Sequence, residues 1–246
     1  MQRQGLPGRI GRVRISRFLW TLFLGVLLVV GCQALFRVHP PDPEDLPWTP
    51  LDLRASIGMF TGRKLAALQR DPGLCHALLK EAGVRFAILP ARQQGARCGW
   101  QDAVRLTGAA APPVPLACPL AAGMAVWLRR VVQPAAADLL GSRVTAVEHF
   151  GSYACRRIGG GAESGWSEHA FANAIDIAGF RLADGRRITV ARDWRSGVKG
   201  DFLHQVRDGG CRLFATTLSP DYNQAHHDHL HFDEASRGEF GWRVCR

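Results

Sequence analysis

One uncharged stretch near the N-terminus constrains this chain more than any other feature. It runs for 19 residues, from Phe18 to Phe36, and a helix of that length can cross the hydrocarbon core of a bilayer. Five arginines and no acidic residue precede it: Arg3, Arg9, Arg12, Arg14 and Arg17. The positive-inside rule then predicts a single-pass inner-membrane protein, with residues 1–17 in the cytoplasm and the rest of the chain in the periplasm.

A cysteine inside this stretch leaves a second interpretation open. The segment Val29–Cys32 can form a lipoprotein cleavage box, which would place a lipid on Cys32. We favour an uncleaved signal anchor, because Ala34, Leu35 and Phe36 continue the apolar run where a mature lipoprotein turns polar. In both interpretations the membrane is a partner of the N-terminal segment.

The basic charge of the chain is concentrated at the same end. The net charge is +10, but the five arginines and Arg37 all fall within the first 37 residues. Without these six, 25 basic residues face 21 acidic ones. The excess is therefore a signal of membrane topology, and the sequence predicts no nucleic-acid binding.

The cysteines agree with an exported domain. Six remain when Cys32 is set aside, and none forms a CxxC pair typical of zinc ribbons or redox motifs. An even number in an oxidising compartment predicts three disulfides. Proximity in the sequence suggests the pairs Cys75 with Cys98, Cys211 with Cys245 and, by what remains, Cys118 with Cys155.

Residues 37–50 are rich in proline and are predicted to form a stiff extended linker, with the folded domain spanning 51–246. Apolar periodicity predicts helices over 63–82, interrupted at Asp71-Pro72-Gly73, over 118–140, the longest, and over 200–208. Alternation and turn signals predict strands over 84–89, 144–152, 174–180, 187–191 and 229–233, the last of them final. The predicted fold class is α+β, with an antiparallel sheet that carries a zinc site, helices packed on one side and one transmembrane helix in front.

Histidines and carboxylates gather in two segments, Ser167–Asp176 and His226–Asp233. Four of the nine histidines fall within six residues of the second segment. If this segment is a strand, its alternation puts His229 and His231 on the same face, where both can reach one ion.

The first segment adds an imidazole at His169 and a carboxylate at Asp176. Two histidines and one carboxylate, with a position open for water, are the ligand set of a catalytic zinc site. Oxidised cysteines leave no thiolate ligands, so Zn²⁺ is the predicted metal. Each segment alone also fits a solvated loop or a helix cap, and the combination favours metal. We expect Glu168 and Asp233, which flank the ligands, to point to the opposite face.

At these residues the sequence resembles a superfamily of zinc peptidases that includes D-Ala-D-Ala carboxypeptidases and dipeptidases, lysostaphin-type endopeptidases and the hedgehog signalling domain. The signature of that superfamily is SxHxxGxAxD followed by a distal DxxH or HxH. More narrowly, the stretch from about Leu74 to Cys245 resembles the bacterial extensin-like C-terminal domain family. Four motifs carry the resemblance, in the expected order: GSYACR, SEHAFANAIDIAGF, DGRRITV and HHDHLHFD.

The resemblance implies a role for six residues. The implied zinc ligands are His169, Asp176 and His231. Asp228 stands at the D of DxxH, where related carboxypeptidases place the general base. His229 would either orient a ligand or stabilise the transition state, and Arg156 would steady the substrate carbonyl or oxyanion. Asn173 is taken to stand where the pattern prefers glycine, and we expect only a small geometric change there.

The resemblance and the predicted topology together indicate hydrolysis of peptide bonds in peptidoglycan stem peptides, by a carboxypeptidase or an endopeptidase. Two alternatives stay open. The domain could be a non-catalytic, zinc-stabilised module that binds cell wall or a protein, or it could cleave another exported amide. Asp228 favours the enzyme, because a binding module needs no carboxylate beside the metal. The sequence does not predict the oligomeric state.

Overall fold

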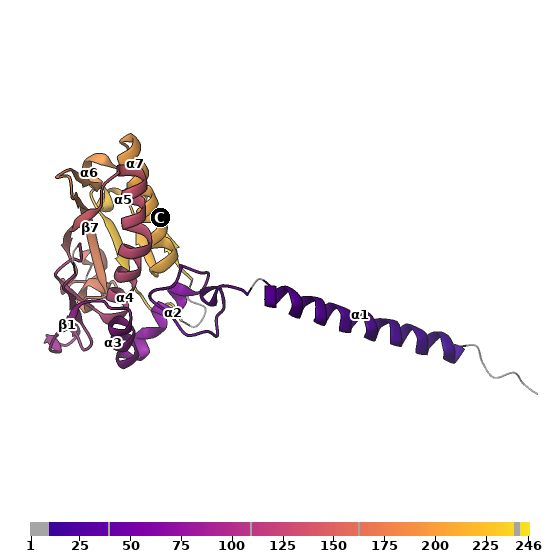
Figure 1. The fold of residues 1–246 in the computed structure, drawn as a ribbon. Helices are drawn as coiled ribbons and strands as arrows, with labels where there is room; N and C mark the ends of the chain where they lie inside the picture. The colour runs from indigo at the N-terminus through magenta and orange to yellow at the C-terminus, as the bar shows by residue number, and fades with distance from the viewer. Residues whose placement is uncertain (1–9, 39, 109, 162, 239–241) are drawn as a thin grey trace, which may run out of the picture. The chain divides into compact units, whose positions relative to one another are not determined.

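A computed structural model describes residues 10–38, 40–108, 110–161, 163–238 and 242–246. The chain divides into two units, residues 1–42 and Pro43–Arg246. The first contains α1 (Ile10–Val38), 29 residues long (Figure 1). Its window Arg17–Ala34 is long and apolar enough to cross a membrane, as an anchor or a signal sequence. Of the predicted basic segment 1–17, residues 1–9 lie outside the described residues, and the rest belongs to α1.

The compact unit begins earlier than the proline-rich sequence suggests. It starts at Pro43, not near Pro50, with a short 3-10 helix over Pro43–Asp45. The side chain of Glu44 is buried there and forms an ion pair with Lys64, with 3.1 Å between Oε2 and Nζ. Glu44 also accepts a hydrogen bond from the hydroxyl of Thr61. A buried carboxylate requires such partners, so the second half of the predicted linker belongs to the folded unit.

Helices form where the apolar periodicity predicts them. The break at Asp71 is confirmed: Asp71 caps the helix that follows, by accepting from the amide of Leu74. Pro72 takes the first helical position, where its missing N–H costs nothing. The helices of this part are α2 (Thr61–Ala67), a 3-10 turn (Leu68–Arg70) and α3 (Pro72–Glu81).

The predicted helix over 118–140 is one helical run with a π-type interruption. It comprises α4 (Cys118–Trp127), a π-helical stretch (Leu128–Val132) and α5 (Gln133–Leu140). Pro134 explains the interruption, because proline lacks an N–H and its ring clashes with the carbonyl four residues earlier. Gly141, at φ 62°, ends the run in the left-handed conformation.

The helix predicted over 200–208 is longer than expected. The observed α7 extends from Gly197 to Leu213. Gly209 and Gly210 weaken its helix propensity, which is why the sequence suggested an earlier end. Both glycines are required by packing: an added Cβ would lie 2.3 Å from Val131 at Gly209 and 2.6 Å from the ring of Phe232 at Gly210.

The central sheet has six strands in the order β11-β9-β10-β7-β6, with β8 paired to β7. All pairs are antiparallel except β11 with β9. The strands are β6 (Val144–Gly151), β7 (Ala174–Leu182), β8 (Arg187–Thr189), β9 (Thr216–Leu218), β10 (Leu230–Asp233) and β11 (Val244–Cys245). The strand predicted over 229–233 is therefore not the final one, because β11 follows it.

Smaller elements complete the unit. A three-stranded antiparallel sheet contains β1 (Phe86–Ile88), β4 (Val104–Leu106) and β5 (Pro115–Leu116), and β2 (Arg92–Gln94) pairs with β3 (Cys98–Trp100). Short helices occupy Ile158–Gly160, Glu168–Phe171, Gln224–His226 and, as α6, Val190–Asp193. Antiparallel sheets with helices confirm the predicted α+β class.

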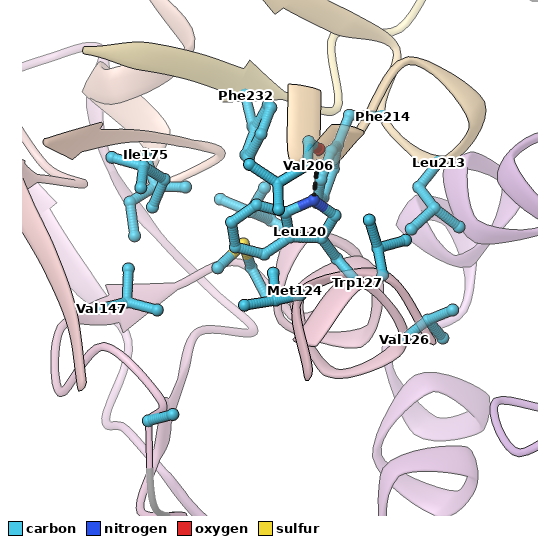
Figure 2. Packing of buried hydrophobic residues seen from close by; sticks show 14 of the residues in the cluster. Leu120, Met124, Val126, Trp127, Val147, Ile175, Val206, Leu213, Phe214 and Phe232 are labelled. Atoms are coloured by element: carbon cyan, nitrogen blue, oxygen red, sulfur yellow. Dashed lines mark hydrogen bonds between the residues drawn. The ribbon is translucent and has the colours of Figure 1, made fainter. Parts of the chain in front are cut away.

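The main core lies between the helical run and one face of the sheet. Trp127 is fully buried, and its ring makes edge contacts with Phe232 at 5.1 Å between centroids. Its indole N–H donates to the carbonyl oxygen of Val206 in α7, at 2.8 Å. Figure 2 shows Trp127 and Met124 packed below Ile175 and Phe232. This packing assigns Ile175 in β7 and Phe232 in β10 to the core face of the sheet.

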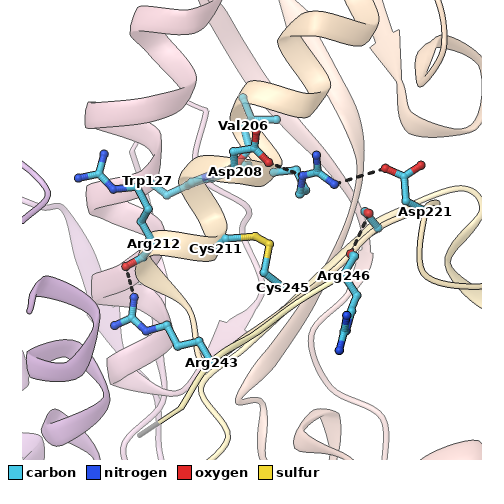
Figure 3. The surroundings of a disulfide bond; sticks show 11 residues. Trp127, Val206, Asp208, Cys211, Arg212, Asp221, Arg243, Cys245 and Arg246 are labelled. Carbon is cyan, nitrogen blue, oxygen red and sulfur yellow. Dashed lines mark hydrogen bonds and ion pairs between the residues drawn. A yellow bond between two sulfur atoms is a disulfide. The ribbon is translucent and has the colours of Figure 1, made fainter. Parts of the chain in front are cut away.

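The structure contains three disulfides among the described residues, as predicted, but two of the expected pairings are wrong. Cys211–Cys245 is confirmed and connects α7 to β11 (Figure 3). The other bonds are Cys75–Cys118 and Cys98–Cys155. Pairing by proximity in the sequence failed because α3 packs against the start of α4, and β3 lies beside the loop after β6. Cys32 is exposed and unbonded.

Candidate metal centre

A cross-strand pair forms the base of the site. His231 in β10 lies directly opposite Asp176 in β7. Their neighbours Ile175 and Phe232 face the core, so alternation along each strand turns Asp176 and His231 to the other face. Nδ1 of His231 lies 2.9 Å from Oδ1 of Asp176.

His169 comes from the short 3-10 helix just before β7. Ser167 caps that helix, because its hydroxyl accepts from the amide of His169 at 3.3 Å. The serine two residues before the histidine thus has a structural role in the predicted motif. The imidazole of His169 is nearly buried, at 4% exposure. Its Nε2 lies 3.3 Å from Oδ2 of Asp176 and 3.3 Å from Nδ1 of His231.

In each of the two histidines, one ring nitrogen points away from the other ligand atoms and contacts an oxygen acceptor; we call it the outer nitrogen, and the other the inner nitrogen. Nδ1 of His169 lies 3.2 Å from the carbonyl oxygen of Ser152, at the end of β6. Nε2 of His231 lies 3.0 Å from Oδ2 of Asp233. An outer N–H that donates to oxygen leaves the inner nitrogen with a free lone pair. Both inner nitrogens then face each other and the carboxylate of Asp176.

These three inner atoms fit a single metal ion. The ligand atoms of His169, Asp176 and His231 all lie within 4.8 Å of one another. A tetrahedral zinc site, with bonds of about 2.05 Å, separates its ligand atoms by about 3.4 Å. The two separations of 3.3 Å around Nε2 of His169 agree with that geometry. Imidazole and carboxylate are also donors that zinc accepts.

The pKa values reflect how strongly these groups interact. Burial alone would lower the pKa of His231, but the hydrogen bonds to Asp176 and Asp233 outweigh it and raise this pKa to about 9. Burial would raise the pKa of Asp176, but the hydrogen bonds from His169 and His231 hold it well below its usual range. Without a metal, these contacts favour a protonated His231 that donates to both carboxylates, so a metal ion would have to displace the proton on Nδ1.

His229 and Asp228 lie at the edge of this cluster. Nε2 of His229 is 3.5 Å from Oδ1 of Asp176, so His229 and His231 do approach the same carboxylate. Nδ1 of His229 lies 2.8 Å from Oδ1 of Asp228. The carboxylate of Asp228 thus contacts the outer nitrogen of His229, and the inner nitrogen of His229 faces the metal ligands.

Arg156 lies at the margin of the histidine cluster. Its side chain is exposed, and its charge helps to lower the pKa of His226. Burial is the main cause of that shift, followed by the charges of His229 and His231, and together they bring the pKa of His226 to about 4. The ring of His226 packs 5.1 Å from that of His229, between centroids. Arg156 therefore lies within electrostatic reach of His226, which packs against the edge of the ligand cluster.

Asn173 was expected to replace the glycine of the superfamily signature, and this expectation is wrong. Ala172, not Asn173, adopts the left-handed conformation, with φ at 54°. Counting three residues on from His169, as the superfamily signature does, also leads to Ala172, so alanine replaces the glycine there. Asn173 has another role, since its Nδ2 donates to Oε2 of Glu168 at 2.6 Å and to the carbonyl oxygen of Glu234 at 3.0 Å.

Sequence reasoning missed two groups that hold the ligands. Asp233 was expected to point away, yet it contacts His231. Residues two apart on a strand share a face, so the alternation itself contained this signal. The carbonyl oxygen of Ser152 left no signal, because a backbone atom carries no residue identity. The expectation for Glu168 is consistent with its bond to Asn173, outside the ligand cluster.

Comparison with known proteins gives one family. The model of the family described as "Extensin-like protein C-terminus" matches residues 73–246, well over half of the chain. No curated protein and no solved structure matches the chain.

Proposed function

The chain belongs to the family of extensin-like protein C-termini, and from this membership and the geometry of its His–Asp–His cluster we propose that it is a zinc-dependent peptidase. The observation that carries the proposal is the arrangement of His169, Asp176 and His231. Three donor atoms converge within 4.8 Å, and the outer nitrogen of each histidine is fixed by an acceptor. Two histidines and one carboxylate are typical of catalytic zinc sites, which keep a position open for water.

Zinc at this position would polarise a peptide carbonyl and lower the pKa of a nearby water toward neutrality. The residues of the chain supply the proton transfer. We assign the base to the pair of His229 and Asp228, which replaces the expectation that Asp228 accepts the proton itself and that His229 orients a ligand or stabilises the transition state. Nε2 of His229 faces Asp176, so it can accept a proton, while Asp228 holds Nδ1–H and stabilises the imidazolium. Arg156, at the margin, would stabilise the developing oxyanion.

The substrate follows from two expectations. The superfamily that the signature resembles includes enzymes that cut peptidoglycan peptides, and the N-terminal topology predicts export with a membrane tether. We therefore propose peptide bonds of peptidoglycan stem peptides as the substrate, with the domain in the periplasm. The apolar helix α1 is consistent with an anchor of that kind.

The test is hydrolysis of defined muropeptides by the full chain in neutral detergent, followed by mass spectrometry. We expect release of a terminal D-amino acid, or a cut cross-link, only when zinc is present. The His169→Ala variant should lose both zinc and activity. The Asp228→Asn variant should retain zinc and lose at least a hundredfold in kcat, because His229 loses its partner.

Two results would redirect the proposal. Zinc bound at one equivalent without any product would indicate the non-catalytic, zinc-stabilised binding module, and a pull-down of cell-wall fragments would follow. Normal turnover by the Asp228→Asn variant would refute the assigned proton transfer and leave the metal site intact. The control is Asp208→Asn, which makes the same charge change on an exposed side chain of α7, away from the site.

A further inference from the structure

A second cavity in the compact unit is lined by arginines and is separate from the histidine cluster. It has a volume of about 390 Å³ and lies between α2 and the segments that follow β10 and precede β11. Arg63, Arg70, Arg237 and Arg243 all line it, and we call it the arginine pocket. Among its lining residues that the structure describes, none is acidic. Among the described lining residues, four positive charges without a carboxylate repel one another, so this part of the wall favours an anion.

Two of the four arginines extend into solvent. Arg63 and Arg70 are exposed, and within the described part of the chain neither has a hydrogen-bond or ion-pair partner. Arg63 lies in α2 and Arg70 ends the 3-10 turn that follows, and the residues beside them in these two elements are buried or half-buried, which fixes the backbone under both side chains. Their guanidinium groups are therefore available to a ligand, at no cost to the fold.

The other two arginines are held by neutral oxygens of the backbone and of a hydroxyl group. Arg237 donates to the carbonyl oxygen of Ala215 at 2.7 Å and to the hydroxyl of Thr216 at 2.6 Å. Arg243 donates to the carbonyl oxygen of Arg212 (Figure 3). These acceptors orient the guanidinium groups but carry only partial charges. Burial lowers the pKa of Arg243, and the nearby carboxyl of Glu234 opposes that shift.

One side of the pocket is lined by the exposed ring of Trp242. The guanidinium of Arg237 lies over the ring of Trp242, at 5.1 Å from the ring centroid. The nearest buried carboxyls, Glu168 and Glu234, do not line the pocket, and neither forms an ion pair with an arginine in the part that the structure describes. Glu234 is fully buried and neither of its carboxylate oxygens has a hydrogen-bond partner.

We propose that the arginine pocket binds a carboxylate or phosphate group. Guanidinium groups present a planar fork of N–H donors that matches both anions in a bidentate manner. A volume of about 390 Å³ accommodates a small multivalent anion, or the anionic group of a larger ligand, and lies at the lower end of small-molecule sites. This inference stands on the pocket alone and does not depend on the proposed peptidase activity.

The test is calorimetric titration of the full chain, in neutral detergent and after removal of metal by a chelator, with inorganic phosphate and separately with citrate. Removal of metal prevents either probe from binding through an ion at the histidine cluster. We expect saturable 1:1 binding that weakens as ionic strength rises. The variant Arg63→Gln with Arg70→Gln should weaken binding at least tenfold, and it should fold normally because both side chains are exposed.

The matched control is Arg97→Gln with Arg105→Gln, two exposed arginines outside the pocket that change the net charge equally. It should bind like the wild type. A preference for phosphate or for citrate would identify the chemical class of the natural ligand. The proposal is overturned if neither probe saturates the folded protein, or if the control loses as much affinity as the pocket variant, because net charge alone would then explain the binding.

Discussion

The contact between Asp233 and His231 can be tested by one substitution, Asp233→Asn. Asparagine has nearly the same shape and volume as aspartate but carries no charge. In the structure Oδ2 of Asp233 accepts from His231, and Oδ1 accepts from the amide of Ala235 at 2.9 Å. An asparagine has one acceptor and one donor group at these positions. Whichever way the amide is turned, one of the two hydrogen bonds is lost, and an amide oxygen that still faces His231 is a weaker acceptor than the carboxylate.

The loss should appear in metal affinity. With the acceptor at Nε2 lost or weakened, the proton of His231 can move to Nδ1, the nitrogen that faces Asp176 and His169. A protonated Nδ1 cannot bind a metal. Removal of a partner of this kind usually weakens metal binding 10- to 100-fold. That range corresponds to about 1.4–2.7 kcal/mol of zinc-binding free energy.

The assay is competition for zinc between the protein and a chromophoric chelator at pH 7.5, with Asp208→Asn as the control. The control has the same charge change on an exposed side chain of α7 and should bind zinc like the wild type. Equal zinc affinity for Asp233→Asn and the wild type would refute the reasoning. A lower zinc affinity in both variants would show that net charge, rather than the contact with His231, determines how tightly zinc binds.

Three further predictions concern stability, each measured by denaturant unfolding of the full chain in neutral detergent. Burial raises the pKa of Glu234, so the stability that its protonated form contributes is fully present below pH 4.5 and is lost as the pH rises through the folded-state pKa. Glu234→Gln should be as stable as the wild type near pH 4 and more stable than it by about 1.4 kcal/mol for each pH unit between 4.5 and the folded-state pKa. Parallel curves of stability against pH would contradict this. Replacing Cys98 and Cys155 by serine opens a loop with a sequence separation of 57 and should cost up to about 4 kcal/mol, whereas an unchanged midpoint would exclude the bond. Trp127→Phe leaves the carbonyl oxygen of Val206 without its indole donor and should lower the free energy of unfolding by roughly 2 kcal/mol. An unchanged free energy of unfolding would show that α7 shifts so that this oxygen finds another donor.

Part of the site could be predicted because its signals are local. Alternation along a strand places Asp176 and His231, and a serine cap places His169, so the spacing of these residues already describes their positions. The chemistry of the ligands then follows from residue type. The α+β class was predictable for the same reason, since each helix and strand carries its own periodicity.

What could not be predicted depends on contacts between distant segments. The pairing of Cys75 with Cys118 requires the packing of α3 on α4, which no local pattern describes. The full length of α7 depends on Val131 and Phe232, which occupy the space that a side chain at Gly209 or Gly210 would need. The arginine pocket was missed because its residues come from two ends of the domain, and the net charge was assigned to the N-terminus.

The core determines the geometry of the candidate metal centre through the register of two strands. Ile175 lies opposite Phe232, and Ile177 opposite Leu230, and all four are fully buried. These pairs alternate with the pair of Asp176 and His231, so one register satisfies both faces of the sheet. A slip of one residue would turn every side chain of β10 to the other face, burying His231 and exposing Phe232. The apolar contacts of Phe232 beneath the sheet thereby hold the ligand atoms above it at metal-binding distance.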